Sequence, residues 1–200
     1  MEYFFYCRDR PGTETLRETT TEAHWSFMDR YADVMIARGP TTAADGTVTG
    51  SMHIVDLPDA EAASVFAFEE PYYRAGVFAD VLVRRWRNGL GRTMWDFDGD
   101  EVNNRRFLII GHGKAGMTAA RDELLAEHRR YFEEHGYLER LIARGPLLSD
   151  DGDEWRGSAI LAELRDRAGV DTMLADEPYV RAGLYASVEI HDWHFGGRPG

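Results

Sequence analysis

The chain contains the same sequence blocks twice, and this internal repeat limits its fold more than any other feature. Residues 36–40 (IARGP) recur letter for letter at 142–146, and residues 70–76 (EPYYRAG) recur at 177–183 with one change. The two offsets are 106 and 107 positions. Elements that keep their sequence while loops change length by a residue are typical of a duplicated unit. The sequence therefore predicts two copies of one small unit.

The repeat divides the 200 residues into two domains of similar length. We place repeat 1 at 1–88, a linker at 89–104 and repeat 2 at 105–200. The linker is rich in Gly, Asp and Asn and lacks apolar periodicity, as connecting segments do. Apolar residues make up 44% of the chain, which is enough for a real core.

Each copy is predicted to follow the order β-α-β-β-α-β. Aromatic and β-branched residues favour an opening strand, and apolar residues at spacings of three and four predict the first helix. His24 and His128 lie on that helix face. Pro71 and Pro178 are expected to end the second helix, because the residue before a proline avoids helical geometry. The predicted ranges include strands 2–8, 51–57, 77–86, 106–111, 158–164 and 184–193, and helices 59–68, 118–135 and 166–175.

The charge balance argues against several classes of partner. The formal net charge of −12 would repel a phosphate backbone, so nucleic acid is not an expected partner. The apolar run near the N-terminus is too short for a signal or a membrane span, so we expect a cytoplasmic protein that does not enter the membrane. Cys7 stands alone, which excludes a disulfide within the chain.

Three segments resemble ligand sites without meeting their requirements. His191 and His194 are three residues apart on a predicted strand, which sends their side chains to opposite faces. The acidic stretch 149–154 lacks the spacing of a calcium loop, and 111–116 lacks the glycine pattern of a phosphate loop. We therefore predict no metal site.

On these elements the chain resembles the YCII-related family, as a tandem two-repeat member. That family belongs to the dimeric α+β barrel superfamily. The resemblance implies an α+β fold in which two ferredoxin-like βαββαβ repeats form an intramolecular dimeric α+β barrel. It covers nearly the whole chain apart from the linker. The features that carry it are Arg8–Gly12, Ala23-His24, Glu127-His128, Gly39-Pro40, Gly145-Pro146, Gly50-Ser51, Gly157-Ser158, the two Pro-Tyr-x-Arg-Ala-Gly blocks, Trp86 and Trp193.

The resemblance also implies a pair of catalytic residues in each repeat. Family members pair the histidine of the first helix with an aspartate just before the Pro of the later block. By position, the pairs here are His24 with Glu70 and His128 with Glu177, so Glu replaces Asp in both copies. Repeat 2 keeps the family-like step of 18 residues from His128 to Pro146, against 16 in repeat 1. If one site alone is competent, this spacing favours His128 and Glu177.

Arginines and tyrosines near these pairs are candidate substrate-binding residues. A guanidinium can bind a carboxylate or phenolate through two parallel hydrogen bonds. The alternative is that the arginines are exposed and balance an acidic surface, and that the tyrosines pack under a helix. The candidates are Arg38, Arg144, Arg74, Arg181, Tyr72 and Tyr179.

A His/Glu pair of this kind suits proton transfer without a cofactor. We predict a cofactor-independent enzyme that isomerises, dehydrates or eliminates a group from a small, aromatic or polyketide-like substrate in catabolism or secondary metabolism. The first alternative is a ligand-binding or assembly module in which each carboxylate only braces its helix. The second is a cofactor-free oxygenase. The expected partner is a small-molecule substrate, and the fold admits a homodimer of two such pseudo-dimers.

Overall fold

The computed structural model describes residues 1–198 and divides the chain into two compact units. Unit 1 comprises Met1–Trp86 together with the C-terminal segment from Trp193 onward. Unit 2 comprises Arg87–Asp192. Each unit therefore contains one repeat and also the short segment that follows the last strand of the other repeat. No helix within residues 1–198 is both long and apolar enough to cross a membrane.

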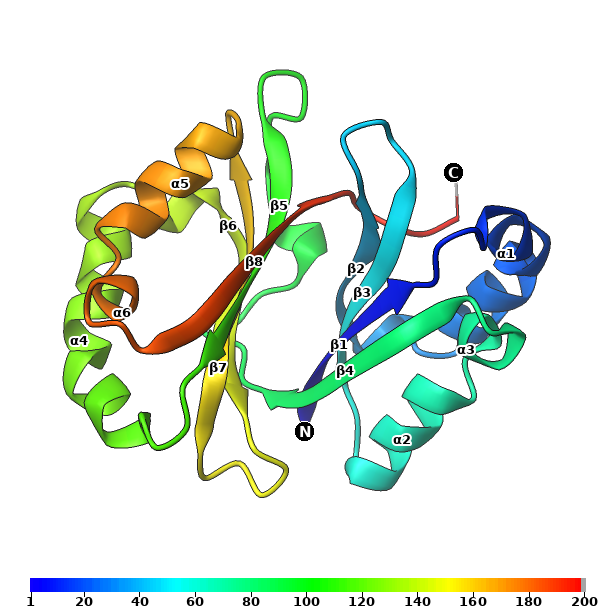
Figure 1. Cartoon of the computed structure of the whole chain (residues 1–200), viewed down its shortest axis with the longest axis horizontal. Coiled ribbons are helices and arrows are strands. Elements are labelled where there is room, and N and C mark those ends of the chain that lie inside the picture. The colour runs from blue at the N-terminus through cyan, green and yellow to red at the C-terminus, as the bar shows by residue number, and fades with distance from the viewer. Residues whose placement is uncertain (199–200) are drawn as a thin grey trace. The chain divides into compact units, whose positions relative to one another are not determined.

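Unit 1 has a four-stranded antiparallel sheet in the order β4-β1-β3-β2. Helices α1, α2 and α3 lie on one face of this sheet (Figure 1). The order is that of a ferredoxin-like βαββαβ unit, as predicted. Its elements are β1 (Glu2–Asp9), α1 (Glu14–Asp29), the 3-10 turn η1 (Ala32–Val34), β2 (Met35–Thr42), β3 (Val48–Asp56), α2 (Ala60–Phe68), α3 (Pro71–Ala75) and β4 (Phe78–Trp86).

Unit 2 repeats this arrangement with the sheet order β8-β5-β7-β6. The 3-10 turn η2 (Met94–Asp96) lies in the segment that leads into it. Helices α4, α5 and α6 cover one face of the sheet (Figure 1). The elements are β5 (Arg105–Gly113), α4 (Thr118–Glu134), η3 (Leu138–Arg140), β6 (Leu141–Leu148), β7 (Trp155–Leu164), α5 (Arg167–Ala175), α6 (Pro178–Arg181) and β8 (Tyr185–Trp193).

The core of each unit lies between its sheet and its helices. In unit 1 the rings of Phe5, Phe27 and Phe66 pack together between β1, α1 and α2. In unit 2, Phe132 of α4 packs with Phe107 of β5. The apolar face of the first helix is thus buried in both copies, which places His24 and His128 at the boundary of the core.

The Pro-Tyr blocks form a short helix that the sequence analysis did not predict. Pro71 and Pro178 end the preceding helix, as expected, and each then starts α3 or α6 as its first residue. Proline fits this position because its fixed φ suits a helix and its missing N–H is not needed there. Glu70 and Glu177 have extended backbones and cap these helices with their side chains.

Gly50 and Gly157 allow the central strands of each sheet to approach closely. A Cβ atom at Gly50 would lie 2.5 Å from the carbonyl oxygen of Cys7. At Gly157 it would lie 2.0 Å from that of Gly111, and Gly157 has a φ of +146°. Both neighbours are backbone atoms of the paired strand, which cannot move without breaking the ladder. This explains why the two repeats share a glycine at this point.

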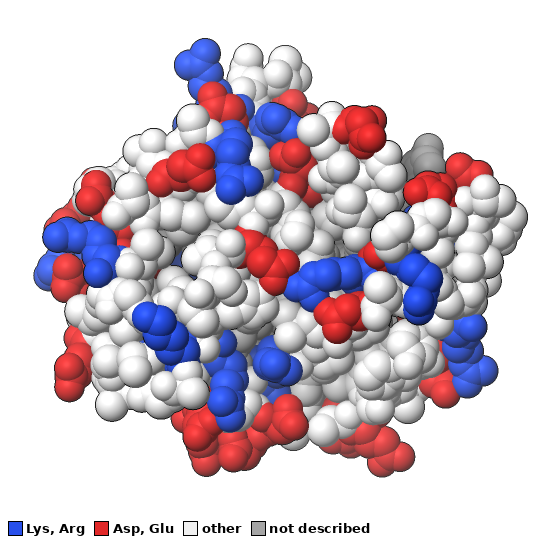
Figure 2. Space-filling model, viewed as in Figure 1, with Lys and Arg blue, Asp and Glu red and all other residues white. Residues whose placement is uncertain are grey.

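Charged side chains are mixed on the face drawn in Figure 2. Lys and Arg lie among Asp and Glu there and form no continuous basic patch.

A pair of glycine substitutions tests the close approach. Gly157→Ala should lower the free energy of unfolding by about 1–3 kcal/mol, because an alanine is strained at this φ and its methyl group meets backbone. Gly169→Ala is the control. It lies in α5, where a Cβ would make ordinary contacts of 3.6 and 3.8 Å, so it should stabilise the protein by about 0.5–1 kcal/mol. Urea denaturation measures both, and equal effects would contradict this account.

Candidate active site

A histidine and a glutamate are in direct contact in both repeats. His24 of α1 lies against Glu70 through Nδ1, and Nδ1 of His128 in α4 lies 2.5 Å from Oε1 of Glu177. All four side chains are buried, with exposures between 1% and 8%. The pairs that the family resemblance implied are therefore formed, whatever their role.

The backbone of the short helix holds each carboxylate in place. Oε2 of Glu70 accepts a hydrogen bond of 3.0 Å from the Tyr73 amide. Glu177 accepts bonds of 3.1 and 3.0 Å from the amides of Tyr179 and Val180. These bonds fix the carboxylate before it meets the imidazole. The short helix thus fixes the position of the glutamate carboxylate in both repeats.

A tyrosine ring stacks on each histidine. The centroids of His24 and Tyr72 are 4.1 Å apart, and those of His128 and Tyr179 are 4.0 Å apart. Burial raises the pKa of the Tyr72 hydroxyl and raises that of Tyr179 to about 12. Both phenols therefore stay protonated at neutral pH. The two tyrosines serve as walls that hold the imidazole planes.

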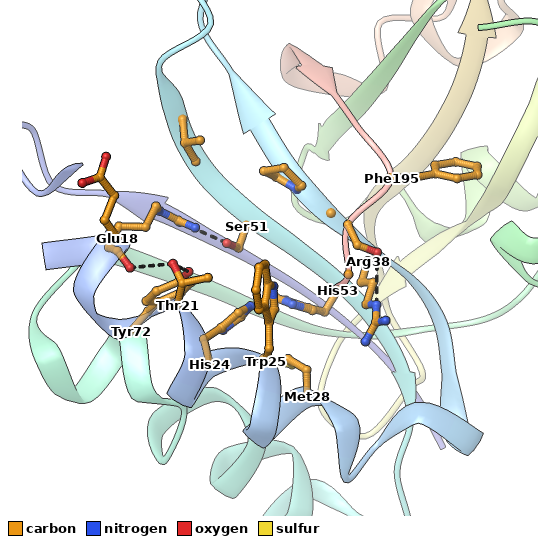
Figure 3. Close-up of a pocket in the computed structure, with 16 residues that line it drawn as sticks. Glu18, Thr21, His24, Trp25, Met28, Arg38, Ser51, His53, Tyr72 and Phe195 are labelled. Atoms are coloured by element: carbon orange, nitrogen blue, oxygen red, sulfur yellow. Dashed lines mark hydrogen bonds between the residues drawn. The ribbon is translucent and has the colours of Figure 1, made fainter. Parts of the chain in front are cut away.

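The cavities beside the two histidines differ in size. His24 lines a cavity of about 350 Å³, whereas the one beside His128 measures about 50 Å³. Figure 3 shows that α1 and the strands β2 and β3 supply most of the wall of the larger one. The spacing argument favoured the His128 site, but the available space favours the His24 site.

Two side-chain differences between the repeats account for the smaller cavity. Leu125 stands where repeat 1 has Thr21, and Phe132 stands where it has Met28. The Phe132 ring contacts both the His128 ring, at 5.1 Å, and the Arg144 guanidinium, at 5.0 Å. The side chains of Leu125 and Phe132, together with the Arg144 guanidinium that lies over the Phe132 ring, occupy space that is open in repeat 1.

The candidate arginines separate into two groups. Arg38 lines the larger cavity and Arg144 the smaller one. Arg74 and Arg181 are exposed and line neither cavity, and Arg74 pairs with Glu69. The structure thus brings the Arg-Gly-Pro arginines to the histidines and leaves the other pair at the surface.

Arg17 is a cavity residue that the sequence analysis missed. Its guanidinium binds Asp9 through bonds of 2.7 and 2.6 Å, donates to Ser51 at 3.0 Å and lies 4.4 Å above the Tyr72 ring. Arg17 and Arg121 each precede their histidine by seven residues, two turns of the same helix. That spacing is the signal that would have found them.

The C-terminal segment of the chain forms part of the repeat 1 cavity. The Gly196 amide donates to the Arg38 carbonyl at 3.1 Å, and Nε of Arg38 donates to the Gly196 carbonyl at 3.2 Å. Phe195 lines the cavity. In unit 2 the Gly89 amide donates to the Arg144 carbonyl at 2.8 Å. Each site therefore carries the segment that follows the last strand of the other repeat.

Arg198 fastens this segment to helix α1. Its guanidinium donates to Glu22 through two bonds of 2.8 Å and to Asp29 at 3.0 Å, and lies 5.6 Å above the Trp25 ring. These bonds raise the pKa of Arg198, so the contact keeps its charge at any working pH. The cavity wall thus depends on an ion pair at its outer edge.

Burial determines the protonation of two further groups. Burial lowers the pKa of His53, which lines the repeat 1 cavity, and the nearby guanidinium groups of Arg38 and Arg17 lower it further. Burial also lowers the pKa of His128, against the opposing effect of Glu177. Both imidazoles are neutral at neutral pH. Within residues 1–198 no cluster of three His, Cys, Asp or Glu side chains has the arrangement of a metal site.

Comparison with known proteins places the chain in a family. The model of the YCII-related domain matches residues 1–87 and again residues 106–194. The chain belongs to the YCII-related family. The two matches confirm the tandem arrangement predicted from the internal repeat.

Two proteins are similar to part of this YCII-related chain. An uncharacterized protein of Haemophilus influenzae is 30% identical over 95 residues, covering 44% of this chain and 97% of the relative. The solved 5-chloro-2-hydroxyhydroquinone dehydrochlorinase of Burkholderia phenoliruptrix is 29% identical over 46% of this chain and 99% of its own, with a TM-score of 0.43. Each of these relatives corresponds in length to one repeat.

A third similarity covers both repeats of the YCII-related chain. Chlorite dismutase of Candidatus Nitrospira defluvii matches 96% of this chain and 91% of its own with a TM-score of 0.62, at 11% identity. Structures of this kind are dimeric α+β barrel proteins. At this identity the likeness is one of fold, and it confirms the predicted fold class.

The lowered pKa of His53 predicts how stability depends on pH. The folded protein holds this imidazole neutral, whereas the unfolded chain protonates it near pH 6.5. The free energy of unfolding should therefore fall as pH drops below about 6.5, by up to about 1.4 kcal/mol per pH unit for this residue. Urea denaturation between pH 7.5 and about 5 should show a shallower decline for His53→Ile than for the wild type. Parallel curves would contradict the assignment.

The ion pairs of Arg198 predict a local effect on the C-terminal segment. Arg198→Ala removes the contacts to Glu22 and Asp29, so the Gly196 amide should exchange with solvent deuterium faster. Mass spectrometry of the C-terminal peptide measures this. Arg130→Ala, which removes an exposed pair with Glu134 on α4, is the matched control and should leave that peptide unchanged. Unchanged exchange in Arg198→Ala would show that the backbone bonds alone hold the segment.

Proposed function

We propose that this protein is a cytoplasmic, cofactor-independent enzyme in which His24, oriented by Glu70, transfers a proton to and from a small organic substrate. The observation that carries the proposal is the place of His24. It is a buried imidazole whose Nδ1 is held by a carboxylate, and it lines a cavity of about 350 Å³.

The contact with Glu70 prepares the imidazole for this role. A carboxylate at Nδ1 selects the tautomer with the proton on that nitrogen, so Nε2 keeps its lone pair. Within residues 1–198, Nε2 of His24 makes no hydrogen bond. When Nε2 takes a proton, the carboxylate stabilises the imidazolium. The Tyr72 ring prevents the imidazole from tilting away from the cavity.

The cavity wall supports a planar, negatively charged substrate. Trp25, Tyr72 and Phe195 provide aromatic surface, and Arg38 provides positive charge beside them. Asp9 already neutralises Arg17, so Arg38 is the cation that we assign to the substrate's anionic group. A volume of about 350 Å³ is in the range of small-molecule sites and suits a molecule of one or two rings.

Proton transfer by a positioned base and acid is enough for isomerisation, dehydration or elimination. In each, a C–H or O–H bond of the substrate breaks and an N–H bond forms at Nε2 of His24. The electron pair moves into the substrate and forms a new double bond or expels a leaving group. The proton then returns to the substrate at another atom or to the group that leaves.

In the second repeat, the observations favour the alternative in which the carboxylate only braces its helix. His128 and Glu177 form the same contact, but a cavity of about 50 Å³ has no room for an organic substrate. We propose that this pair fixes α4 against α6 and takes no part in the reaction. The duplication then provides one reacting site and one structural copy.

Hydrogen–deuterium exchange at carbon tests the proposal. We would incubate the protein in deuterated water with cyclic 1,3-diketones and small oxo acids, which carry an acidic C–H beside a carbonyl, and follow signal loss by proton NMR. His24→Ala should slow the catalysed exchange by about 10²- to 10⁴-fold, because it removes the general base. Glu70→Gln should slow it less, since the imidazole remains.

His128→Ala is the matched control, since it makes the same change in the other repeat. It should lower the melting temperature and leave the exchange rate per folded molecule unchanged. Circular dichroism of each variant establishes that it is folded. Equal exchange in His24→Ala and the wild type would rule out the catalytic role, and loss of exchange in His128→Ala alone would move it to repeat 2.

A further inference from the structure

A second histidine lies in the repeat 1 cavity, outside the His24 and Glu70 pair. His53 belongs to β3, where its register partners are Phe5 on one side and Arg38 on the other. Paired residues of antiparallel strands share a face, so His53 and Arg38 project the same way. The centroid of the His53 ring lies 5.9 Å from that of His24 (Figure 3).

The ring nitrogens of His53 make no hydrogen bond to any of residues 1–198, although the side chain is only 4% exposed. Its ring contacts are with His24 and Phe66. Neither ring nitrogen is among the fully enclosed side-chain atoms that lack a partner, so both nitrogens keep some access to the cavity. Since His53 also lines the cavity, a bound molecule can supply the missing bond.

The protonation of His53 defines which bond it can make. Burial and the nearby guanidinium groups of Arg38 and Arg17 keep its pKa low, so the ring is neutral. A neutral imidazole carries one N–H donor and one acceptor. As a donor that holds its proton tightly, it can polarise a carbonyl oxygen without transferring the proton, a known role of neutral histidine in enolisation.

The second repeat has no such group. Ile160 occupies the same register position, paired with Ile109 and Arg144 as His53 is with Phe5 and Arg38. Ile160 belongs to the apolar core of unit 2. An isoleucine here fits the fold equally well, which means that the fold itself does not require the histidine.

We propose that His53 donates a hydrogen bond to the substrate oxygen on which negative charge develops while His24 removes a proton. The substrate is then a planar anion with a C–H bond beside a carbonyl group, and its anionic end lies at Arg38. The C–H bond breaks and its proton passes to Nε2 of His24. The electron pair moves to the carbonyl oxygen, which becomes an enolate held by the N–H of His53.

This assignment rests on the proposed function and specifies its substrate class. The two imidazoles share no hydrogen bond, and their separation lets them contact different atoms of one small molecule. The substrate carbon then lies at His24 and the oxygen at His53. A compound with an acidic C–H but no neighbouring carbonyl would leave His53 unpaired and would be bound less well.

The test uses 4-nitrophenolate, a planar oxyanion that resembles an enolate, with protein labelled with nitrogen-15 in histidine. We expect the probe to shift the ring resonances of both His24 and His53. His53→Ile, which installs the repeat 2 residue, should weaken binding about tenfold. His53→Gln keeps an N–H donor and should bind within about threefold of the wild type. Ile160→Val in repeat 2 is the matched control and should not change the affinity.

Stability provides a readout that separates ligand binding from a structural role. If His53 is kept for the ligand, His53→Ile should unfold at a higher urea concentration than the wild type, because an apolar side chain replaces a largely buried imidazole and Ile160 occupies this position in the core of unit 2. A lower midpoint would indicate that the ring supports the fold. That result, together with unchanged affinity for 4-nitrophenolate, overturns the proposal.

Failure of this inference can be told from failure of the proposed function. If His24→Ala abolishes carbon-bound exchange while His53→Ile exchanges and binds like the wild type, His24 remains the base and His53 has no role. If 4-nitrophenolate shifts His24 alone, or does not bind at millimolar concentration, the assignment of His53 is also wrong. If His24→Ala retains full exchange, both proposals fall.

Discussion

The carboxylate that precedes each Pro-Tyr block is the point on which the rest of the site depends. Glu70 accepts a backbone bond from α3 and at the same time contacts the imidazole of α1. The short helix therefore presents a fixed carboxylate to the histidine, and the histidine cannot rotate without losing its partner. Because the cap and the pair use one residue, the geometry at His24 is set by the fold.

The duplicated chain contains this arrangement twice, and the residues that surround it differ between the two copies. The histidine, glutamate, tyrosine and Arg-Gly-Pro arginine occur in both, while the residues around them differ in size and polarity. Repeat 2 places Leu125, Phe132 and Ile160 where repeat 1 has Thr21, Met28 and His53. Phe132 and Ile160 belong to the apolar core of unit 2, whereas Thr21, Met28 and His53 line the larger cavity of repeat 1. Under the proposed function, repeat 2 contributes stability and repeat 1 carries the reaction.

Much of the fold could be predicted from sequence because the duplication supplied its own comparison. The two copies of IARGP and of the Glu-Pro-Tyr block indicate where strands, turns and helix ends lie. The short helices after Pro71 and Pro178 and the 3-10 turns η1, η2 and η3 were missed. The site was harder. Residue identity and spacing brought Glu70 to His24, but cavity size depends on side chains that pack from several elements. In the sequence, His53 is one residue of a predicted strand. Only the structure shows that it lines the cavity and has no hydrogen-bond partner among residues 1–198.

The segment that follows the last strand of each repeat packs in the unit of the other repeat. Sequence similarity alone does not reveal this arrangement. The segment after Trp193 belongs to unit 1, and the one after Trp86 belongs to unit 2. Repeat 1 alone would lack Phe195 and the backbone bonds between Gly196 and Arg38, so its cavity would lose a wall and Arg38 a restraint. In this chain the duplication places the segment after Trp193 within the same molecule, so the complete site does not depend on protein concentration.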